Sequence, residues 1–251
     1  DADAVYKEET VYVNADATGT IDEVTVSNWL KNSGSVSGSL TDASTLKDIK
    51  NVKGDETFKE SGDTLTWNTD GEDIYYQGTT DQDLPVSVKL TYYLDGKEIK
   101  PADLKGKSGH LKIQVDYTNK EKKTVSVDGK QEEVYTPFVM MTGMILPNET
   151  FSNVTIDNGK VISDGSKNIV VGFGMPGMKE SLNLDESKTE DLTIPESLCV
   201  EADVTDFTMS STFTVALTDL LDDIDFDNIV DVDSLKSSLD ELEDAALQLV
   251  S

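Results

Sequence analysis

The sequence predicts a mainly β protein, with an antiparallel β-sandwich-like body followed by a C-terminal α-helical heptad segment. Residues 85–117 alternate apolar and polar side chains, which is typical of a sheet with one face in water. Turn dipeptides rich in Gly, Asn and Asp separate short strand-like runs along most of the chain. From residue 216 onward the apolar spacing becomes that of a helix. We therefore predict one or two β units and then a helix.

Residues 1–84 are predicted to form a first, N-terminal β-rich unit. Val11 and Val13 indicate a strand, residues 14–19 a turn, and Val24–Val26 the returning strand. Residues 32–44 are rich in Ser, Gly, Thr and Asp, so we expect a loop there. Three further short strands are expected at Thr57–Lys59, Thr64–Asn68 and Asp73–Gln77.

Residues 85–215 are predicted to form an antiparallel β-sandwich-like domain of about seven strands. The first two strands are the alternating runs 86–94 and 111–117, whose apolar sets each occupy one face. Asn158-Gly159 predicts a tight turn, so Phe151–Ile156 and Lys160–Ile162 are expected to pair as a hairpin. The remaining strands are expected at Asn168–Val171, Leu198–Val204 and Phe207–Val215.

Residues 216–251 are predicted to be an acidic helical segment that begins a coiled-coil stalk. The stretch 206–251 holds twelve acidic residues and a single base, Lys236. Asp233 or Ser234 can cap a helix that carries the heptad positions. These positions are Leu235, Leu239, Leu242, Ala246 and Leu249. The leucine seam fits a partner interface or stalk, and packing against the β body is the alternative.

Composition excludes several partners. The chain of 251 residues carries 49 acidic residues against 21 lysines and no arginine, which gives a net charge of −28. This charge repels phosphate backbones and anionic membrane surfaces, so we expect no nucleic acid and no membrane contact in this segment. The sequence contains no run of about 18 apolar residues, so we expect no membrane-spanning helix in it. If the protein is exported, we expect a signal or anchor ahead of Asp1.

Two motifs resemble ligand sites by letter only. Residues 14–22 place oxygen-bearing side chains like a calcium loop, but Thr25 stands where the bidentate carboxylate belongs. A hairpin turn is the favoured interpretation, with a calcium-dependent adhesion domain as a hypothesis. Residues 172–177 match a dinucleotide fingerprint, yet Pro176 interrupts it and no long helix follows. We expect a glycine-rich bulge or loop between strands, with no cofactor and no metal.

The single histidine and the single cysteine are the remaining chemical candidates. His110 directly precedes the strand 111–117, which favours a histidine at a strand edge over a catalytic base. Cys199 lies between Leu198 and Val200, which favours a buried packing thiol. A lone cysteine also excludes an intrachain disulfide. With 49 acids, paired carboxylates are uninformative, so the sequence assigns no catalytic residue and predicts no enzyme.

Several strings together resemble a known family. These strings are Glu9–Asn14, Asp73–Thr80, Tyr92–Ile99, Thr142–Pro147, Val204–Phe207 and Leu239–Val250. With them the chain resembles the N-terminal extracellular head of Firmicutes membrane-anchored surface proteins with xxxLxxG heptad-repeat stalks, such as phage-infection-protein-like proteins and accessory proteins of type VII secretion. The resemblance implies a cell-surface location in Gram-positive bacteria and transfers no functional residue. The glycine of the repeat is missing near the end of this chain.

We therefore expect a non-enzymatic head domain for adhesion, scaffolding or interaction with an export apparatus. Its partner would be a protein or a cell-wall component, with self-association possible through the heptad helix. The alternative is a carbohydrate- or peptidoglycan-binding module, or a secreted hydrolase that uses carboxylates. An exposed Trp29 or Trp67 that lies beside Tyr76 on one flat face would favour the binding module.

Overall fold

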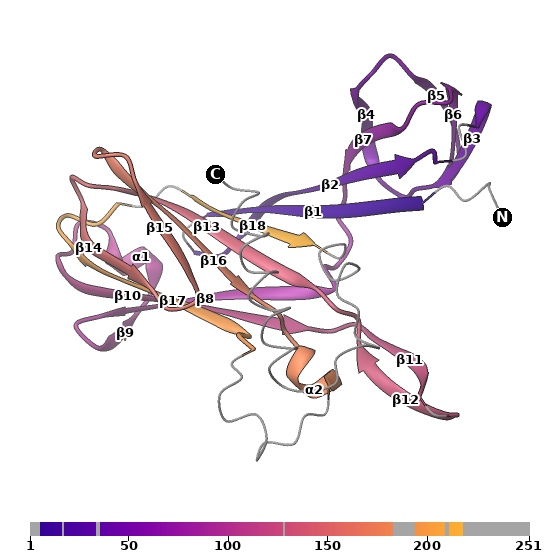
Figure 1. The fold of residues 1–251 in the computed structure, drawn as a ribbon. Coiled ribbons are helices and arrows are strands. Elements are labelled where there is room, and N and C mark those ends of the chain that lie inside the picture. Colours follow the sequence, from indigo (N-terminus) through magenta and orange to yellow (C-terminus); the bar gives the residue numbers. More distant parts are fainter. Residues whose placement is uncertain are drawn as a thin grey trace.

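A computed structural model describes residues 6–16, 18–33, 36–127, 129–182, 194–208 and 211–217. Its mainly β fold, built from several antiparallel sheets, confirms the predicted class (Figure 1). The strands are β1 (Tyr6–Asp16), β2 (Ile21–Lys31), β3 (Ser37–Ala43), β4 (Lys47–Lys53), β5 (Thr57–Ser61), β6 (Thr64–Asp70), β7 (Ile74–Thr79), β8 (Val86–Leu94), β9 (Lys97–Ile99), β10 (Gly109–Asn119), β11 (Lys122–Val127), β12 (Lys130–Tyr135), β13 (Val139–Pro147), β14 (Phe151–Ile156), β15 (Gly159–Ser163), β16 (Lys167–Gly174), β17 (Ser197–Val204) and β18 (Ser211–Leu217). Two short helices are α1 (Pro101–Leu104) and α2 (Met178–Leu182).

One long sheet joins strands from both predicted units. Its order is β15-β16-β13-β18-β1-β2-β7-β4, and β1 pairs with β2 on one side and β18 on the other. Val13 therefore lies opposite both Val24 and Thr214. At one edge, β4 carries Lys47, Lys50 and Lys53, and such charges discourage further strand pairing. Residues before and after position 85 thus share one hydrogen-bonded sheet.

The main core lies between the long sheet and a five-stranded sheet of order β14-β17-β10-β8-β9. The alternation predicted for β8 and β10 is confirmed, and the two strands pair antiparallel with Ile113 opposite Tyr92. The inward residues of β10 are nearly inaccessible, with Leu111 and Ile113 each 1% exposed. Burial on this scale stabilises the fold by about 1.5–3 kcal/mol per large apolar side chain.

A second, smaller core lies in a lobe that is formed by β2, β7 and the strands between them in sequence, β3 to β6. A three-stranded sheet of order β3-β6-β5 covers the inner side of β2 and β7 there. Trp67 is fully buried and packs against Phe58 and Tyr76, with ring centroids 4.7 and 5.3 Å apart. The predicted units therefore share a sheet but have separate hydrophobic clusters.

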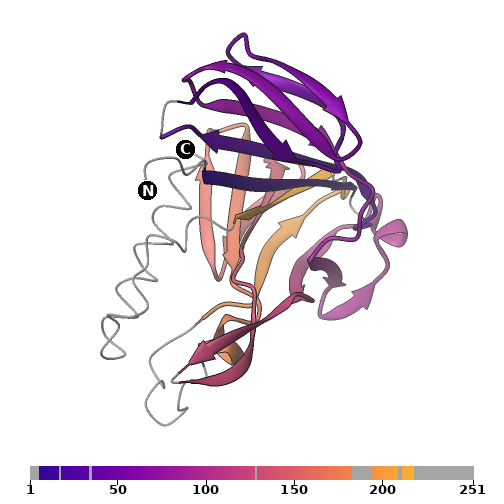
Figure 2. The ribbon, with the colours of Figure 1, turned by 90° about the vertical axis from the view of Figure 1, so that its right-hand side faces the viewer.

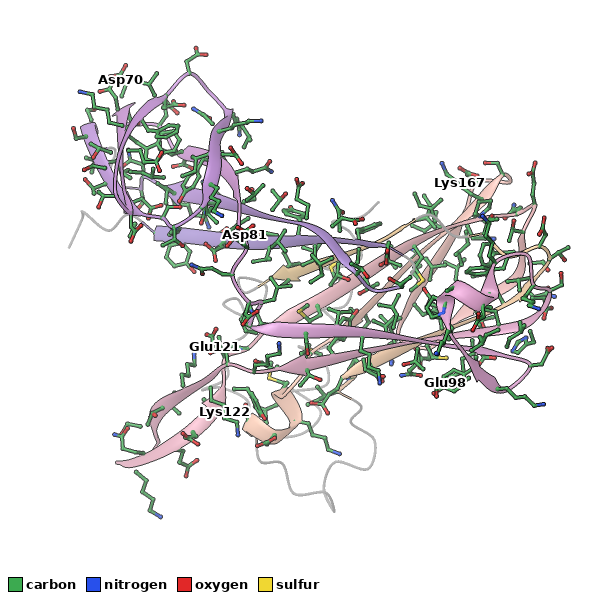
Figure 3. The ribbon with its side chains drawn as sticks, turned by 180° about the vertical axis from the view of Figure 1, so that it is seen from behind. Asp70, Asp81, Glu98, Glu121, Lys122 and Lys167 are labelled. Atoms are coloured by element: carbon green, nitrogen blue, oxygen red, sulfur yellow. The ribbon has the colours of Figure 1, made fainter. Side chains whose placement is uncertain are left out.

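The views show an elongated, branched molecule rather than a sphere. The lobe around Asp70 and the far end around Glu98 and Lys167 lie at opposite ends (Figure 3). The β11–β12 hairpin projects from the body as a separate arm (Figure 1). Within the described residues, no helix is both long enough and apolar enough to cross a membrane.

Two sequence-based predictions are wrong at the level of strands. The expected loop over residues 32–44 contains β3, because Leu40 is 3% exposed in the lobe core and lies opposite Trp67. Its polar neighbours hid this single apolar anchor. The strand β4 was likewise not predicted. The three short strands expected between Thr57 and Gln77 are confirmed as β5, β6 and β7.

The predicted hairpin between residues 151–156 and 160–162 is also wrong. β14 pairs with β17 in the five-stranded sheet, whereas β15 pairs with β16 in the long sheet. The Asn158-Gly159 turn therefore forms a corner between two sheets. A Cβ atom on Gly159 would lie 2.1 Å from the carbonyl oxygen of Val171, so the close approach of β16 requires glycine here.

The boundary of the predicted helical segment also shifts. Ala216 and Leu217 end strand β18, where Leu217 pairs with Val139, so the chain is still extended at the point where we expected a helix. The rest of that segment, residues 218–251 with all its heptad positions, lies outside the described residues. The helix and the stalk therefore stay predictions.

Candidate functional site

The imidazole of His110 sits between two acids on the solvent-facing side of the five-stranded sheet. β10 places His110 opposite Asp203 of β17. His110 Nδ1 lies 3.1 Å from Asp203 Oδ1, and Nε2 lies 3.1 Å from Glu201 Oε2. Asn153 donates from Nδ2 to the other Asp203 oxygen at 2.7 Å. A bulge in β14 between Ser152 and Thr155 brings Asn153 into reach.

The electrostatics of this group favour a charged ring beside a charged Asp203. The hydrogen bond to Asp203, followed by that to Glu201, raises the pKa of His110 above 6.5. The amide of Asn153, followed by His110, holds the pKa of Asp203 below 3.8. As an imidazolium the ring donates from both nitrogens, so neither nitrogen is left to act as a base.

Cys199 lies on the same solvent-facing side, which corrects its predicted place in the core. Strand alternation buries Leu198 and Val200 at 1% exposure each and turns the intervening Cys199 outward. Its Sγ contacts Glu201 Oε1 at 4.0 Å. Partial burial, only partly opposed by Lys112, raises the pKa of the thiol above 9.0. At neutral pH the sulfur therefore keeps its proton and is a poor nucleophile.

This acid–histidine group lies on an open strand face. The His110 side chain is 52% exposed. Two cavities of about 590 and 570 Å³ lie elsewhere, and both are lined by residues of the connection between β7 and β8. Asp81 lines the first and Glu121 the second, and both are labelled in Figure 3. Neither cavity is lined by His110 or Cys199.

The loop that resembles a calcium site is confirmed as a hairpin turn. Asp16 Oδ1 accepts hydrogen bonds from the backbone nitrogens of Thr18 and Thr20 at 2.8 and 3.0 Å, and from the Thr18 hydroxyl at 2.5 Å. These bonds lower the pKa of Asp16 below 3.8, and the bond from the Thr18 hydroxyl contributes most. The carboxylate therefore closes the turn between β1 and β2. Across the described residues, no cluster of three or more His, Cys, Asp or Glu could hold a metal ion.

The glycine-rich stretch 172–177 serves close packing. The expected loop is confirmed only for residues 175–177, because Gly172 and Gly174 belong to β16, which ends at Gly174. A Cβ on Gly172 would lie 2.6 Å from side-chain carbons of Ile156 and Leu198, and one on Gly174 would lie 2.7 Å from the Tyr117 ring. The helix α2 that follows is only five residues long. These glycines therefore let the two sheets approach each other.

A cluster of aromatic and lysine side chains forms a second candidate site, which we call the aromatic–lysine patch. Trp29 of β2 stacks on its strand neighbour Tyr75 of β7, with ring centroids 5.5 Å apart and planes at 16°. Lys31 Nζ lies 4.1 Å from the Trp29 ring centroid, and Lys53 Nζ lies 4.4 Å from that of Tyr75. Trp29 Nε1 donates to Asp73 Oδ2 at 2.9 Å.

Sequence reasoning found only part of this patch. It named Trp29 but paired exposed aromatics with Tyr76, whereas Tyr76 and Trp67 are both fully buried in the lobe core. In β7 the neighbouring Tyr75 points the other way and is half-buried. Choosing between Tyr75 and Tyr76 requires the strand register, which the Tyr-Tyr pair alone does not define.

Comparison with known proteins adds no relative. No family model matches the sequence, and no curated protein is significantly similar to it. The likeness to heads of stalked surface proteins stays a prediction.

Proposed function

We propose that this chain is the non-enzymatic, β-sandwich-like head of an extracellular, membrane-anchored surface protein of Gram-positive type, which binds a protein or cell-wall partner. The observation that carries the proposal is the aromatic–lysine patch, whose half-buried rings lie on the side of β2 and β7 that faces away from the lobe core. Such a head serves adhesion, scaffolding or contact with an export apparatus. The heptad spacing of Leu235–Leu249 supports a stalk below it.

The patch has the chemistry of a binding surface. Trp and Tyr carry much of the binding energy at protein interfaces, because they bury a large rigid area at low entropic cost. The lysines above the two rings hold them in place through cation–π contacts worth about 0.5–1 kcal/mol each at an exposed site. Lys31 also forms an ion pair with Glu8. The stacked pair is thereby preorganised on the sheet.

The acid–histidine group argues against catalysis at His110 and Cys199. Both nitrogens of His110 are engaged by carboxylates, and the Cys199 thiol is protonated at neutral pH. A nucleophile needs a base that is free to take its proton. The open strand face around His110 also provides no walls to position a substrate.

The test is cosedimentation of the full chain with washed Gram-positive cell walls, prepared with and without protease treatment. Binding to untreated walls that is lost after protease treatment identifies a protein partner. Binding to both preparations identifies a wall polymer. Absence of binding to either preparation, at concentrations up to about 100 μM, contradicts the proposal.

A carbohydrate- or peptidoglycan-binding module is the second candidate, favoured by the stacking of Trp29 on Tyr75. These rings stack on a sugar when the glycan displaces Lys31 and Lys53 from the ring faces. Purified peptidoglycan fragments would then bind with a dissociation constant that rises at least tenfold in Trp29→Ala. A glycan array without signal, together with protein-dependent wall binding, would eliminate this candidate.

A further inference from the structure

The long sheet has a second face that points away from the five-stranded sheet. In β13, Met140 and Met144 belong to the main core, so strand alternation turns Val139, Met141 and Ile145 to the other side. Pairing with β16 and β18 extends this side across three strands. We call it the outer apolar face, formed by Val139, Met141, Val171, Phe173, Phe213 and Val215.

The middle of the outer apolar face is buried although it lies outside the main core. Met141 is 4%, Val171 2% and Phe173 6% exposed, whereas Ile145, on the same strand and the same side, is 46% exposed. Phe213 folds over Gly143, where a Cβ would lie 1.9 Å from its ring. Neighbouring side chains of the same sheet shield only the sides of a large side chain. Its tip stays in water unless a further layer of protein covers the sheet.

The described elements do not provide that layer. The main contacts of β13 and β18 are with their neighbours in the long sheet, and β16 also contacts β14 and β17 on the opposite side. In Figure 2 no coloured strand or helix of the described chain lies over the outer side of β13 and β16. The cover therefore comes from elsewhere in the chain or from another molecule.

We infer that residues 218–251 of the same chain cover the outer apolar face. β18 ends at Leu217, beside Val139, so the next residues start at the border of this face. The 34 residues that follow (251 minus 217) offer two apolar rows with acids between them. These rows are Leu220, Leu221 and Ile224, and Leu235, Leu239 and Leu242.

Other parts of the chain fit this role less well. Among the stretches outside the described residues, only 183–193 also exceeds a few residues. It contains Leu184 and Leu192 but four acids, so it lacks an apolar row. The docking is independent of what the head binds. Where Leu220, Leu221 and Ile224 form the cover, the heptad positions of residues 235–249 stay available for the proposed stalk. Where Leu235, Leu239 and Leu242 form it, those positions pack on the body and no stalk begins within them.

Thiol labelling in the full chain tests this packing. The parent carries Cys199→Ser, so that each added cysteine is the only thiol. Met141→Cys reports on the outer apolar face, and its matched control is Ile145→Cys on the same strand and side. Met144→Cys, at a position 1% exposed in the main core, reports whether the body stays folded. With residues 218–251 unchanged, the thiol of Met141→Cys should react at least tenfold more slowly than that of Ile145→Cys.

Two triple variants then remove the proposed cover. One is Leu220→Ser, Leu221→Ser, Ile224→Ser and the other is Leu235→Ser, Leu239→Ser, Leu242→Ser. At least one of them should raise the labelling rate at position 141 tenfold or more while the thiol at position 144 stays protected. The control Asp222→Ser, Asp223→Ser, Asp225→Ser, on the acidic side of the same segment, should change the rate less than twofold.

Three results would overturn the inference. The first is equal labelling at positions 141 and 145 with residues 218–251 unchanged, and the second is protection at position 141 in both triple variants. The third is protection that fades on dilution, which identifies a second copy as the cover. If the thiol at position 144 also becomes reactive, the triple substitution has unfolded the body. The single substitutions Leu221→Ser and Leu239→Ser are then used instead of the triple variants, and the same labelling results at position 141 support or overturn the inference.

Discussion

The pKa of His110 depends on acids from another strand. A raised histidine pKa stabilises the folded state fully below 6.5, the ordinary value, and this contribution is lost as pH rises through the folded-state value. The lowered pKa of Asp203 acts in the opposite sense, since its contribution is present above 3.8 and lost as pH falls through the folded-state value. The pair is therefore most stabilising between pH 3.8 and 6.5.

We predict that the His110 ring titrates above pH 6.5 in the folded chain. Because it is the only histidine, its ring resonances give the pKa directly by NMR. Asp203→Asn should lower the pKa more than Glu201→Gln, since the bond to Asp203 is the larger cause. Lys89→Gln, which removes a charge elsewhere, serves as the control. A pKa at or below 6.5 in the parent would refute this description.

Gly159 tests the corner between the two sheets. Gly159→Ala places a Cβ against the backbone of β16, which cannot move aside without separating the strands. We expect a loss of about 1–3 kcal/mol in the free energy of unfolding, measured by urea denaturation. Ser163→Ala, at an exposed position of the same strand, should stay within about 0.5 kcal/mol. Equal stability of the two variants would contradict the close approach.

At the scale of elements, a buried hydrogen-bond chain ties the two main sheets together. The Tyr117 hydroxyl of β10 lies 2.5 Å from Thr142 Oγ1 of β13, which lies 2.9 Å from Thr214 Oγ1 of β18. In contrast, within the described residues the buried hydroxyl of Tyr92 has no hydrogen-bond partner. Two tyrosines in one core therefore differ in what their hydroxyls contribute.

This difference predicts opposite effects of the same substitution. Tyr117→Phe should cost about 1–3 kcal/mol in the free energy of unfolding, because it leaves the threonine hydroxyls without their partner. Tyr92→Phe should leave stability unchanged or raise it, because it removes an unpaired polar atom. Urea denaturation of both variants measures the contrast. A larger loss of unfolding free energy in Tyr92→Phe than in Tyr117→Phe would show that the hydrogen-bond chain of Tyr117 does not stabilise the contact between the sheets.

Elements with clean alternation could be predicted, and those fixed by tertiary contacts could not. β8 and β10 follow from their period of two. β3 has one apolar anchor, Leu40, whose partner Trp67 lies 27 positions away (67 minus 40), so local sequence suggests a loop. The predicted hairpin at Asn158-Gly159 failed because the turn signal does not say which sheet each arm joins.

The site residues show the same limit. His110 is separated from Glu201 and Asp203 by 91 and 93 positions, so their meeting depends on the β10–β17 register. Cys199 was placed on the wrong side because two apolar neighbours resemble a core run, although alternation alone would turn it outward. Trp29 was found from its residue type, while Tyr75 and Lys53 required the pairing of β2, β7 and β4.

At the scale of the whole molecule, the net charge of −28 opposes a compact fold. Raising NaCl from about 0.01 to 1 M shortens the screening length from roughly 30 to 3 Å. We therefore predict that the urea midpoint at pH 7 rises with salt. Near pH 4, where about half of the carboxylates are neutral, the rise should be smaller. A midpoint that falls with salt at pH 7 would mean that local ion pairs outweigh the overall repulsion.

The most direct test of the proposed binding head compares wall binding by matched variants of the full chain. Trp29→Ala with Tyr75→Ala removes the aromatic–lysine patch, whereas His110→Gln alters only the acid–histidine group. We predict that the first variant loses at least tenfold in affinity for the preparation that the parent binds, and that His110→Gln binds as the parent does. Unchanged binding without the patch, or a loss confined to His110→Gln, would contradict the account.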